Sequence, residues 1–353
     1  MNILIIPDSF KGSLTSHQVC LAIKEGIEST NDNCNIDYIP FSDGGEGFAK
    51  CFCHISGGEI INSKCHDIYG REIDGYFVGF GDTAVIESAV ASGLQQRKNI
   101  MQASSYGTGE LIKSAFDMGY KNIILGLGGS GCCNGAMGAL SALGVTFYDE
   151  IFEPITKPKA IDMNNVFGVS FKNAIKGINI TFACDVENEY FGKNGGAYVF
   201  APQKGARKTD VVELDEGLQR LNAFFNNDIS TVKGGGAAGG ICGGLFAVFG
   251  GEIKSGFDIL CEYANLEEKI KNADLVITGE GKTDSQTLMG KLPYKICNIA
   301  KKHGKKTVVI SGAIDGVTLG DKMISLVDEN TDTQTAIENA KQILVEKSKS
   351  ILQ

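Results

Sequence analysis

The sequence predicts an α/β protein with a parallel sheet and a second, smaller lobe. Short, nearly continuous apolar runs such as NIIL and DLVIT are typical of strands that are covered on both faces. Helical stretches alternate with these runs, which favours the α/β class. The 353 residues are enough for two domains, because one domain usually takes ~100–200 residues.

The individual elements follow from local patterns in chain order. Strands are expected at residues 2–6, 36–40, 83–87, 122–127, 178–183, 274–278 and 307–311. Helices are expected at residues 15–27, 104–118, 214–226, 292–303 and 331–353, and the first of them opens with a Ser/Thr cap signal.

The division into lobes is expected to be discontinuous. Residues 57–80 read as short, partly alternating strands that differ from the buried strands elsewhere, so they suggest a second, mixed lobe. We expect the first lobe to hold residues 1–45, 102–184 and 265–353, and the second to hold residues 46–101 and 185–264.

Composition narrows the function. A net charge of −9 and a pI of about 5.1 disfavour a nucleic-acid or anionic-membrane surface, which needs clustered cations. We expect no transmembrane helix and no signal peptide. The eleven cysteines then suggest reduced thiols and a cytoplasmic protein. The spacing of Cys51, Cys53, His54, Cys65 and His66 fits no common zinc pattern, so we read them as ordinary residues.

Two polar segments follow the first two strands. PDSFKGSLTS places Asp8, Ser9 and Lys11 at the carboxyl end of a strand, where open α/β sheets bind ligands. A plain strand-to-helix turn is the alternative. FSDGGEGF carries Asp43 and Glu46, which suit Mg²⁺ because it prefers oxygen ligands; a plain acidic turn explains the segment equally well.

The third segment, GLGGSGCCNGAMG, contains a G-x-G-x-x-G pattern. A dinucleotide-binding turn is one interpretation, with Asp149 or Glu150 as the ribose acid. Backbone amides of the same turn would bind any phosphate, and tight packing without a ligand is a third option.

The fourth segment, ACDVENEYFGKNGGAYVFAPQKGA, carries Asp185 at a strand end and then Gln203 and Lys204. KGGGAAGGICGG follows, and we interpret the region around Gly236 as a helix N-terminus that lies close to backbone or phosphate.

The fifth segment, VITGEGKTDSQTLMGKLP, ends its strand with G-K-T, the last letters of a P-loop. A P-loop needs a glycine where this chain has Val276. Glu280, Asp284 and Gln286 instead make an acid-rich turn that resembles a metal and substrate loop; a solvated acidic turn is the alternative.

Together, these segments place acids, lysines and glycine amides at several strand ends of one expected sheet. That inventory fits phosphoryl transfer, which needs Mg²⁺, groups that hold phosphate and a carboxylate that orients the attacking hydroxyl. Hydrolysis by a Ser-His-Asp set fits poorly, because none of the four histidines lies beside a nucleophile motif.

The same five segments, in the same order, resemble the motif set of the bacterial glycerate kinase family, of the glycerate 2-kinase type. The resemblance runs from residue 2 to about residue 313. It implies phosphorylation of D-glycerate to 2-phospho-D-glycerate with ATP and Mg²⁺. It also implies two α/β lobes, one Rossmann- or flavodoxin-like, with the site in the cleft between them. No P-loop is used, so G-K-T would be incidental.

The sequence departs from the family pattern in three places. Cys133 and Asn134 stand where the family commonly has Asn and Asp, which puts metal or substrate handling there in doubt. Asn188-Glu189 replaces a common N-P, and Lys282 replaces a frequent arginine, which loses a bidentate fork.

The resemblance, together with the residue types, suggests roles for individual side chains. Asp185 is the first candidate for the base and Asp284 the second, with Lys11 on phosphate or the substrate carboxylate and Asp43 sharing the metal and base roles. The expected phosphate-binding residues are Gly128, Gly129, Ser130 and Gly236; the expected substrate-binding residues are Asp8, Ser9, Gln203, Lys204 and Gln286; and the candidate metal ligands are Asp43, Glu46 and Glu280.

Two alternative functions remain at this stage. One is a nicotinamide-dependent oxidoreductase built on the Gly126–Gly131 turn, and the other is a non-catalytic paralogue that binds glycerate or nucleotide. The expected partners are D-glycerate and ATP, with no nucleic acid and no membrane, and a homodimer is one option for the assembly.

Overall fold

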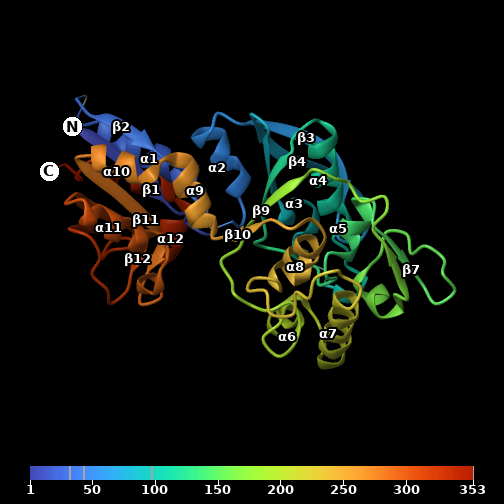
Figure 1. Cartoon of the computed structure of the whole chain (residues 1–353). Coiled ribbons are helices and arrows are strands. Elements are labelled where there is room, and N and C mark those ends of the chain that lie inside the picture. The colour runs from blue at the N-terminus through green and yellow to red at the C-terminus, as the bar shows by residue number, and fades with distance from the viewer. Residues whose placement is uncertain (32, 43, 97, 353) are drawn as a thin grey trace. The chain divides into compact units, whose positions relative to one another are not determined.

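The chain forms two compact α/β units in the computed structural model, which describes residues 1–31, 33–42, 44–96 and 98–352 (Figure 1). Unit 1 consists of residues 1–42, 54–56 and 257–353, and unit 2 consists of residues 43–53 and 57–256. The predicted α/β class is therefore confirmed. The unit made from the middle of the chain is the larger one, although we expected the second lobe to be smaller.

Unit 1 is built on a five-stranded parallel sheet in the order β13-β12-β11-β1-β2. Its strands are β1 (Asn2–Pro7), β2 (Asn35–Tyr38), β11 (Leu275–Thr283), β12 (Lys306–Ile314) and β13 (Lys322–Ser325). Renumbered along the unit, this is the flavodoxin-like order 2-1-3-4-5, whose switch point lies between β1 and β11. Ligands bind outside the carboxyl ends of the strands at such a point.

Helices cover both faces of this sheet. They are α1 (Ser16–Glu28), α9 (Gly256–Ala264), α10 (Leu266–Asn272), α11 (Leu292–Lys302), α12 (Thr333–Glu338) and α13 (Ala340–Ser348). Helix α1 begins at a capping box formed by Thr15 and Gln18, and it packs with α13 over Ile3, Ile5 and Ile277. Helix α11 contacts β11 and β12, so the sheet is buried on both sides, as its apolar strands predict.

Unit 2 contains a six-stranded mixed sheet in the order β10-β9-β6-β5-β4-β3. Its strands are β3 (Glu59–His66), β4 (Glu72–Phe80), β5 (Thr83–Glu87), β6 (Asn122–Gly126), β9 (Asn179–Ala183) and β10 (Glu252–Lys254), and β7 (Thr146–Tyr148) pairs with β8 (Gly168–Ser170) in a separate ribbon. Strands β5, β6, β9 and β10 are parallel, whereas β3 and β4 form the antiparallel meander.

The helices of unit 2 are α2 (Phe48–Ile55), α3 (Ser88–Ser92), α4 (Tyr106–Asp117), α5 (Met137–Ala142), α6 (Gly196–Phe200), α7 (Lys208–Asn222) and α8 (Ala237–Phe249), with the end of α2 grouped with unit 1. Helices α4, α5 and α8 pack into one apolar core with the sheet. Tyr190 is fully buried in this core, and its hydroxyl donates to Gly135 O at 2.9 Å.

Two expectations about the lobes differ from the structure. Residues 102–184, expected in the first lobe, lie in unit 2, because β6 and β9 pair in parallel with β5. The glycine and acid segments therefore end strands of two sheets, and not of one. No helix in the described part of the chain is long and apolar enough to span a membrane.

Candidate functional site

The switch point of unit 1 brings the first and fifth polar segments side by side. The Asp8 amide donates to Gly279 O at 2.8 Å, so the segment after β1 runs along β11. Asp8 Oδ1 accepts from the Ser9 amide at 2.6 Å, which fixes the direction of that carboxylate. A Cβ on Gly281 would lie 3.3 Å from the Lys11 amide nitrogen, so this glycine allows close approach. Predicted residues of two distant segments thus meet at the edge where ligands bind.

Glu280 anchors the turn that follows β11. Its side chain is 6% exposed, and Oε1 accepts from the hydroxyls of Thr287 at 2.5 Å and Thr283 at 3.3 Å. Lys291 Nζ lies 3.4 Å from Oε2. Because protein donors contact both carboxylate oxygens, Glu280 acts as a scaffold for this turn, and its role as a metal ligand stays a prediction.

Asp284 lies in that turn with its carboxylate only partly covered. Its side chain is 22% exposed, Oδ1 accepts from the Gln286 amide at 2.9 Å, and Lys282 Nζ lies 3.9 Å from Oδ2. The Thr287 hydroxyl accepts from the Asp284 amide at 3.0 Å and thereby ties the residue to Glu280. Asp284 is therefore an oriented carboxylate that still faces solvent, whereas the Gln286 side chain is exposed.

The G-K-T sequence does not form a phosphate-binding loop. Gly281, Lys282 and Thr283 all lie within β11, and Lys282 is exposed and pairs with Asp315 at 2.9 Å. A P-loop requires these residues in a turn that opens a helix. The prediction that G-K-T is incidental is confirmed by this placement.

In unit 2, the Gly126–Gly131 turn packs against the turn that precedes α2. Cβ atoms on Gly126 and Gly128 would lie 2.9 Å from Gly44 O and 2.5 Å from Gly45 Cα, and the Gly128 amide donates to Gly44 O. These two glycines serve close backbone approach. Of the predicted phosphate-binding residues here, Gly129 and Ser130 keep amides without a backbone partner among the residues described.

Lys204 and Ser130, both predicted from sequence, are in direct contact. Lys204 is 5% exposed, and its ammonium donates to Ser130 Oγ and to Cys132 O, each at 2.8 Å. Burial lowers the pKa of the Lys204 ammonium. No described carboxylate is paired with it. Lys204 therefore holds the Ser130 hydroxyl in place, and its part in substrate binding stays a prediction.

Gly236 does not offer its amide to a ligand. That amide donates to Asn188 O at 3.0 Å, and a Cβ there would lie 2.2 Å from Glu189 O. The prediction that this stretch lies close to backbone is confirmed, and Gly236 leaves the phosphate-binding set. The cause is packing, because the start of α8 meets the segment after β9 almost backbone to backbone.

Other predicted residues lie at the surface of unit 2. Asp185 follows the end of β9 and is exposed, Glu46 is exposed in the turn before α2, and Gln203 O accepts from Lys98 Nζ at 2.9 Å. Asp43 lies outside the described residues. Of the predicted residues that remain candidates, Asp8, Ser9, Lys11 and Asp284 belong to unit 1, whereas Gly129, Ser130 and Lys204 belong to unit 2.

Sequence reasoning missed Glu87, a buried carboxylate at the end of β5. It is 4% exposed, and its oxygens accept from the Gly47 amide at 3.1 Å and the Ala49 amide at 2.9 Å. Burial raises the pKa of Glu87 more than these hydrogen bonds lower it. Glu87 thus holds the glycine turn before α2 on the sheet. An acid that ends the apolar run TAVIE was the signal that could have revealed it.

The departures from the family pattern at Cys133 and Asn134 concern packing. Both residues are 0% exposed, and burial raises the pKa of the Cys133 thiol to about 12. In the amide orientation that satisfies both side-chain atoms, Asn134 accepts from the Gly138 and Ser105 amides and donates to Ser105 Oγ. Asn134 therefore joins the starts of α4 and α5.

A dinucleotide site at Gly126–Gly131 lacks its required setting. Helix α5 begins only at Met137, so the turn does not open a helix whose N-terminus could hold a pyrophosphate. Strands of the unit 2 sheet follow one another in sequence order, so this sheet has no switch point. Asp149 and Glu150 follow β7 in the separate ribbon, away from the ribose position of that motif.

The donor set suits a magnesium ion that is held mainly by a ligand. No described group of three or more His, Cys, Asp or Glu side chains is arranged to hold a metal. Mg²⁺ commonly takes one or two carboxylates and completes its shell with phosphate oxygens and water. Asp8, directly after β1, and Asp284, in the turn after β11, each offer a carboxylate of this kind.

Comparison with known proteins agrees with this architecture. A solved structure of a candidate glycerate kinase 2 from Salmonella typhimurium LT2 matches with a TM-score of 0.88 and 33% identity, covering 99% of this chain and 97% of that one. The chain is 36% identical over 327 residues to a glycerate kinase of Haemophilus influenzae, covering 89% of this chain and 86% of the relative. It is 36% identical over 326 residues to a glycerate 2-kinase of Escherichia coli K12, with the same coverages of 89% and 86%. The family model for the glycerate kinase family matches residues 3–353, and the chain belongs to that family.

Proposed function

We propose that this protein transfers the γ-phosphoryl group of ATP to the C2 hydroxyl of D-glycerate, with Mg²⁺, to give 2-phospho-D-glycerate and ADP. Family membership supports the reaction class and the acceptor. The name of the Escherichia coli relative supports the position. The observation that carries the proposal is the oriented, solvent-facing carboxylate of Asp284 in the turn that follows β11, the strand that pairs with β1 at the switch point of unit 1.

Asp284 is the carboxylate that we assign as the general base. Its direction is set by the Gln286 amide and by the buried Glu280 scaffold, and a fixed acceptor is what proton transfer needs. Asp185, our first candidate from the sequence, is exposed and follows a strand end of unit 2. In the reaction, Asp284 accepts the proton of the C2 hydroxyl while that oxygen bonds to the γ-phosphorus and the β–γ bridge bond breaks.

The remaining charges of the reactants are assigned by chemistry. Lys11 is exposed next to the Gly281 contact and is suited to the carboxylate of glycerate. Asp8, together with phosphate oxygens and water, would hold the magnesium ion, which when bound would neutralise charge on the phosphate oxygens. The amides of Gly129 and Ser130, with the Ser130 hydroxyl, would bind the phosphates of the nucleotide, and Lys204 positions that hydroxyl.

The experiment is phosphorus NMR of a reaction that contains purified protein, D-glycerate and Mg-ATP. We expect ADP and one new phosphomonoester signal whose proton coupling identifies attachment at C2. Attachment at C3 would contradict the position, whereas binding of glycerate or nucleotide without ADP formation would indicate a sensor. A parallel sample with NAD should show no absorbance change at the reduced-cofactor band, and such a change would favour an oxidoreductase.

A further inference from the structure

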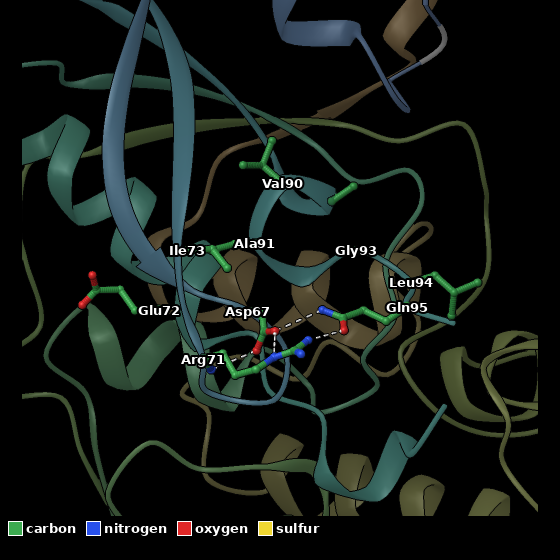
Figure 2. Close-up of a pocket in the computed structure, with 10 residues that line it drawn as sticks. Asp67, Arg71, Glu72, Ile73, Val90, Ala91, Gly93, Leu94 and Gln95 are labelled. Carbon is green, nitrogen blue, oxygen red and sulfur yellow. Dashed lines mark hydrogen bonds and ion pairs between the residues drawn. The ribbon is translucent and has the colours of Figure 1, made fainter. Parts of the chain in front are cut away.

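Unit 2 contains a pocket that none of the predicted residues lines. Its volume is about 480 Å³, and it lies between the β3–β4 turn and the segment of α3 with the loop that follows (Figure 2). The residues that matter for its chemistry are Asp67, Arg71, Val90, Gly93, Leu94 and Gln95.

One side of the pocket carries a preorganised arginine. Arg71 Nε donates to Asp67 Oδ2 at 2.6 Å, and a terminal nitrogen donates to Gln95 Oε1 at 2.7 Å. Gln95 in turn donates to Asp67 at 3.2 Å, so three side chains hold one another, as Figure 2 shows. Arg71 has five N–H donors, and its side chain is 68% exposed, so donors remain for a ligand. A guanidinium fixed in this way is suited to phosphate oxygens.

Another side of the pocket is apolar and open. Val90 lies across from the arginine network in Figure 2, and Leu94 is 48% exposed although its side chain is large and hydrophobic. The volume falls within the ~300–1,000 Å³ that small-molecule pockets usually have. A three-carbon acid would fill little of it, whereas a nucleoside would cover the apolar wall.

The pocket borders the turn to which we assign phosphate binding. The Leu94 amide donates to Gly129 O at 3.0 Å, the Gly131 amide donates to Ser92 O at 2.7 Å, and Gly93 pairs with Ser130 in an isolated bridge. A ligand against Gly93 and Leu94 therefore lies next to the Gly129–Ser130 turn.

A cation behind that turn has no described carboxylate partner. Lys204 is buried, and its ammonium contacts only neutral oxygens of Ser130 and Cys132 among its recorded hydrogen bonds in the described chain. A buried charge is costly unless it is paired. An anion at the turn would supply the missing opposite charge.

We propose that this pocket binds the nucleoside triphosphate donor, with its phosphates on Arg71 and the Gly129–Ser130 turn and its nucleoside on Val90 and Leu94. The inference rests on the proposed function for the identity of the ligand. The inference is supported by the pocket geometry, by the fixed guanidinium of Arg71 and by the buried ammonium of Lys204, which has no described carboxylate partner. It needs no sequence motif.

The test compares two variants that act on different parts of the ligand. Arg71→Gln removes the phosphate contact, and Val90→Phe narrows the apolar wall. Lys113→Gln is the control, because it removes one positive charge from α4 outside the pocket. Calorimetry of each folded protein measures binding of Mg-ATP, inorganic triphosphate and adenosine, and thermal unfolding confirms that each variant is folded.

Each of the two substitutions should weaken the binding of a different part of the nucleotide. We expect Arg71→Gln to weaken triphosphate and Mg-ATP binding about tenfold or more while adenosine binding is unchanged. Val90→Phe should weaken adenosine and Mg-ATP while triphosphate binding is unchanged, and Lys113→Gln should change none of them. If Arg71→Gln disturbs folding, Arg71→Lys retains the charge without the fork and should weaken triphosphate binding in the same direction.

Other outcomes would contradict the pocket assignment and leave the proposed function intact. Unchanged Mg-ATP binding in both variants, with wild-type protein that still phosphorylates glycerate, would place the nucleotide elsewhere. A raised KM for glycerate with unchanged ATP affinity in Arg71→Gln would assign the pocket to the acceptor. If the wild type does not phosphorylate glycerate, the proposed function fails, and the calorimetric comparison still decides whether this pocket binds the nucleotide.

Discussion

At the scale of single residues, the buried ammonium of Lys204 destabilises the folded protein. Its ammonium is almost without contact with water, and burial lowers its pKa. A lysine with a lowered folded pKa destabilises the fold below that pKa, and the penalty disappears as the pH rises through the folded pKa toward the ordinary value of 10.5.

Replacement of this lysine should therefore have a pH-dependent effect. The free energy of unfolding of wild type, minus that of Lys204→Met, should increase between neutral and alkaline pH. Urea denaturation at both pH values measures it, with Lys113→Met as the control for the loss of an exposed lysine. A flat difference for Lys204→Met would show that its ammonium is not destabilised by burial.

The contribution of Glu87 to stability changes with pH in the opposite direction. Burial raises its folded pKa above the ordinary value of 4.5, so its contribution to stability is fully present below that value and is lost as the pH rises through the folded pKa. Wild type should therefore lose stability relative to Glu87→Gln over this interval. At acidic pH, Glu87→Ala should cost about 1 kcal/mol because the amides at the start of α2 lose an acceptor. Equal slopes of stability against pH in wild type and Glu87→Gln would contradict the raised pKa.

Asp284 gives the residue-scale prediction for activity. Asp284→Asn keeps the size of the side chain and removes the proton acceptor, so kcat should fall about 100-fold or more while the KM for ATP changes little. Asp315→Asn is the matched control, because Asp315 is an exposed acid that also pairs with Lys282. Steady-state kinetic assays of the variants measure kcat and the KM for ATP. A larger fall in kcat for Asp185→Asn than for Asp284→Asn would return the base role to Asp185.

At the scale of elements, the glycines of α8 determine how closely it approaches the turn after β6. Ala238, Gly239 and Gly240 all have left-handed φ angles, and the regular helix starts after them. A Cβ on Gly239 would lie 2.1 Å from Cys132 O, and one on Gly244 would lie 2.2 Å from Gly135 O. The helix therefore supports the turn that carries Ser130 through backbone contact.

Two glycines of similar φ allow the cost of a left-handed backbone to be measured apart from the cost of a close Cβ contact. Gly239 has a φ of +66° and the contact with Cys132, whereas Gly304, in the Schellman turn that ends α11, has a φ of +65° and nothing within 4 Å of a built Cβ. Gly304→Ala should cost about 1–2 kcal/mol for the left-handed backbone alone. Gly239→Ala should cost roughly 3 kcal/mol more because backbone must move. Denaturation midpoints measure both, and equal losses would show that the close contact does not matter.

Elements of regular pattern were predictable from the sequence, and the close contacts were not. The apolar runs that form β1, β6 and β11 and the cap signal of α1 are local properties, so they lie where we expected them. Which glycine amides remain free depends on partners far along the chain. The amide of Gly128 donates to Gly44 O and that of Gly236 donates to Asn188 O, and no local sequence pattern predicts such pairs.

At the scale of the whole molecule, sheet membership was the part that local reasoning could not supply. β5, β6 and β9 resemble the strands of unit 1 in composition, because parallel strands covered on both faces share the same apolar character. Only the pairing of β6 with β5 and β9 assigns them to unit 2. The candidate residues were therefore identified by type, while their division between two sheets required the structure.

The nucleotide assignment predicts where amide exchange should slow when ligand is added. Mg-ATP should protect residues 89–94 and the Gly129–Ser130 turn in unit 2, because the proposed pocket and turn become covered. Hydrogen–deuterium exchange with mass spectrometry of the full chain measures it, with D-glycerate alone as the control that should leave these peptides unchanged. Protection confined to other peptides would contradict the assignment.

The neighbouring strands β1 and β11 have a consequence for biosynthesis. Ile6 accepts a hydrogen bond from Thr278, a residue 272 positions later in the chain. At ~5–20 residues per second, the ribosome reaches β11 roughly 15 to 55 s after it has made β1. During that interval, all of unit 2 is translated, while β1 and α1 have no partner strand on that side. A nascent chain of this protein therefore completes its middle first, and its opening strand must be kept from aggregation until the last third emerges.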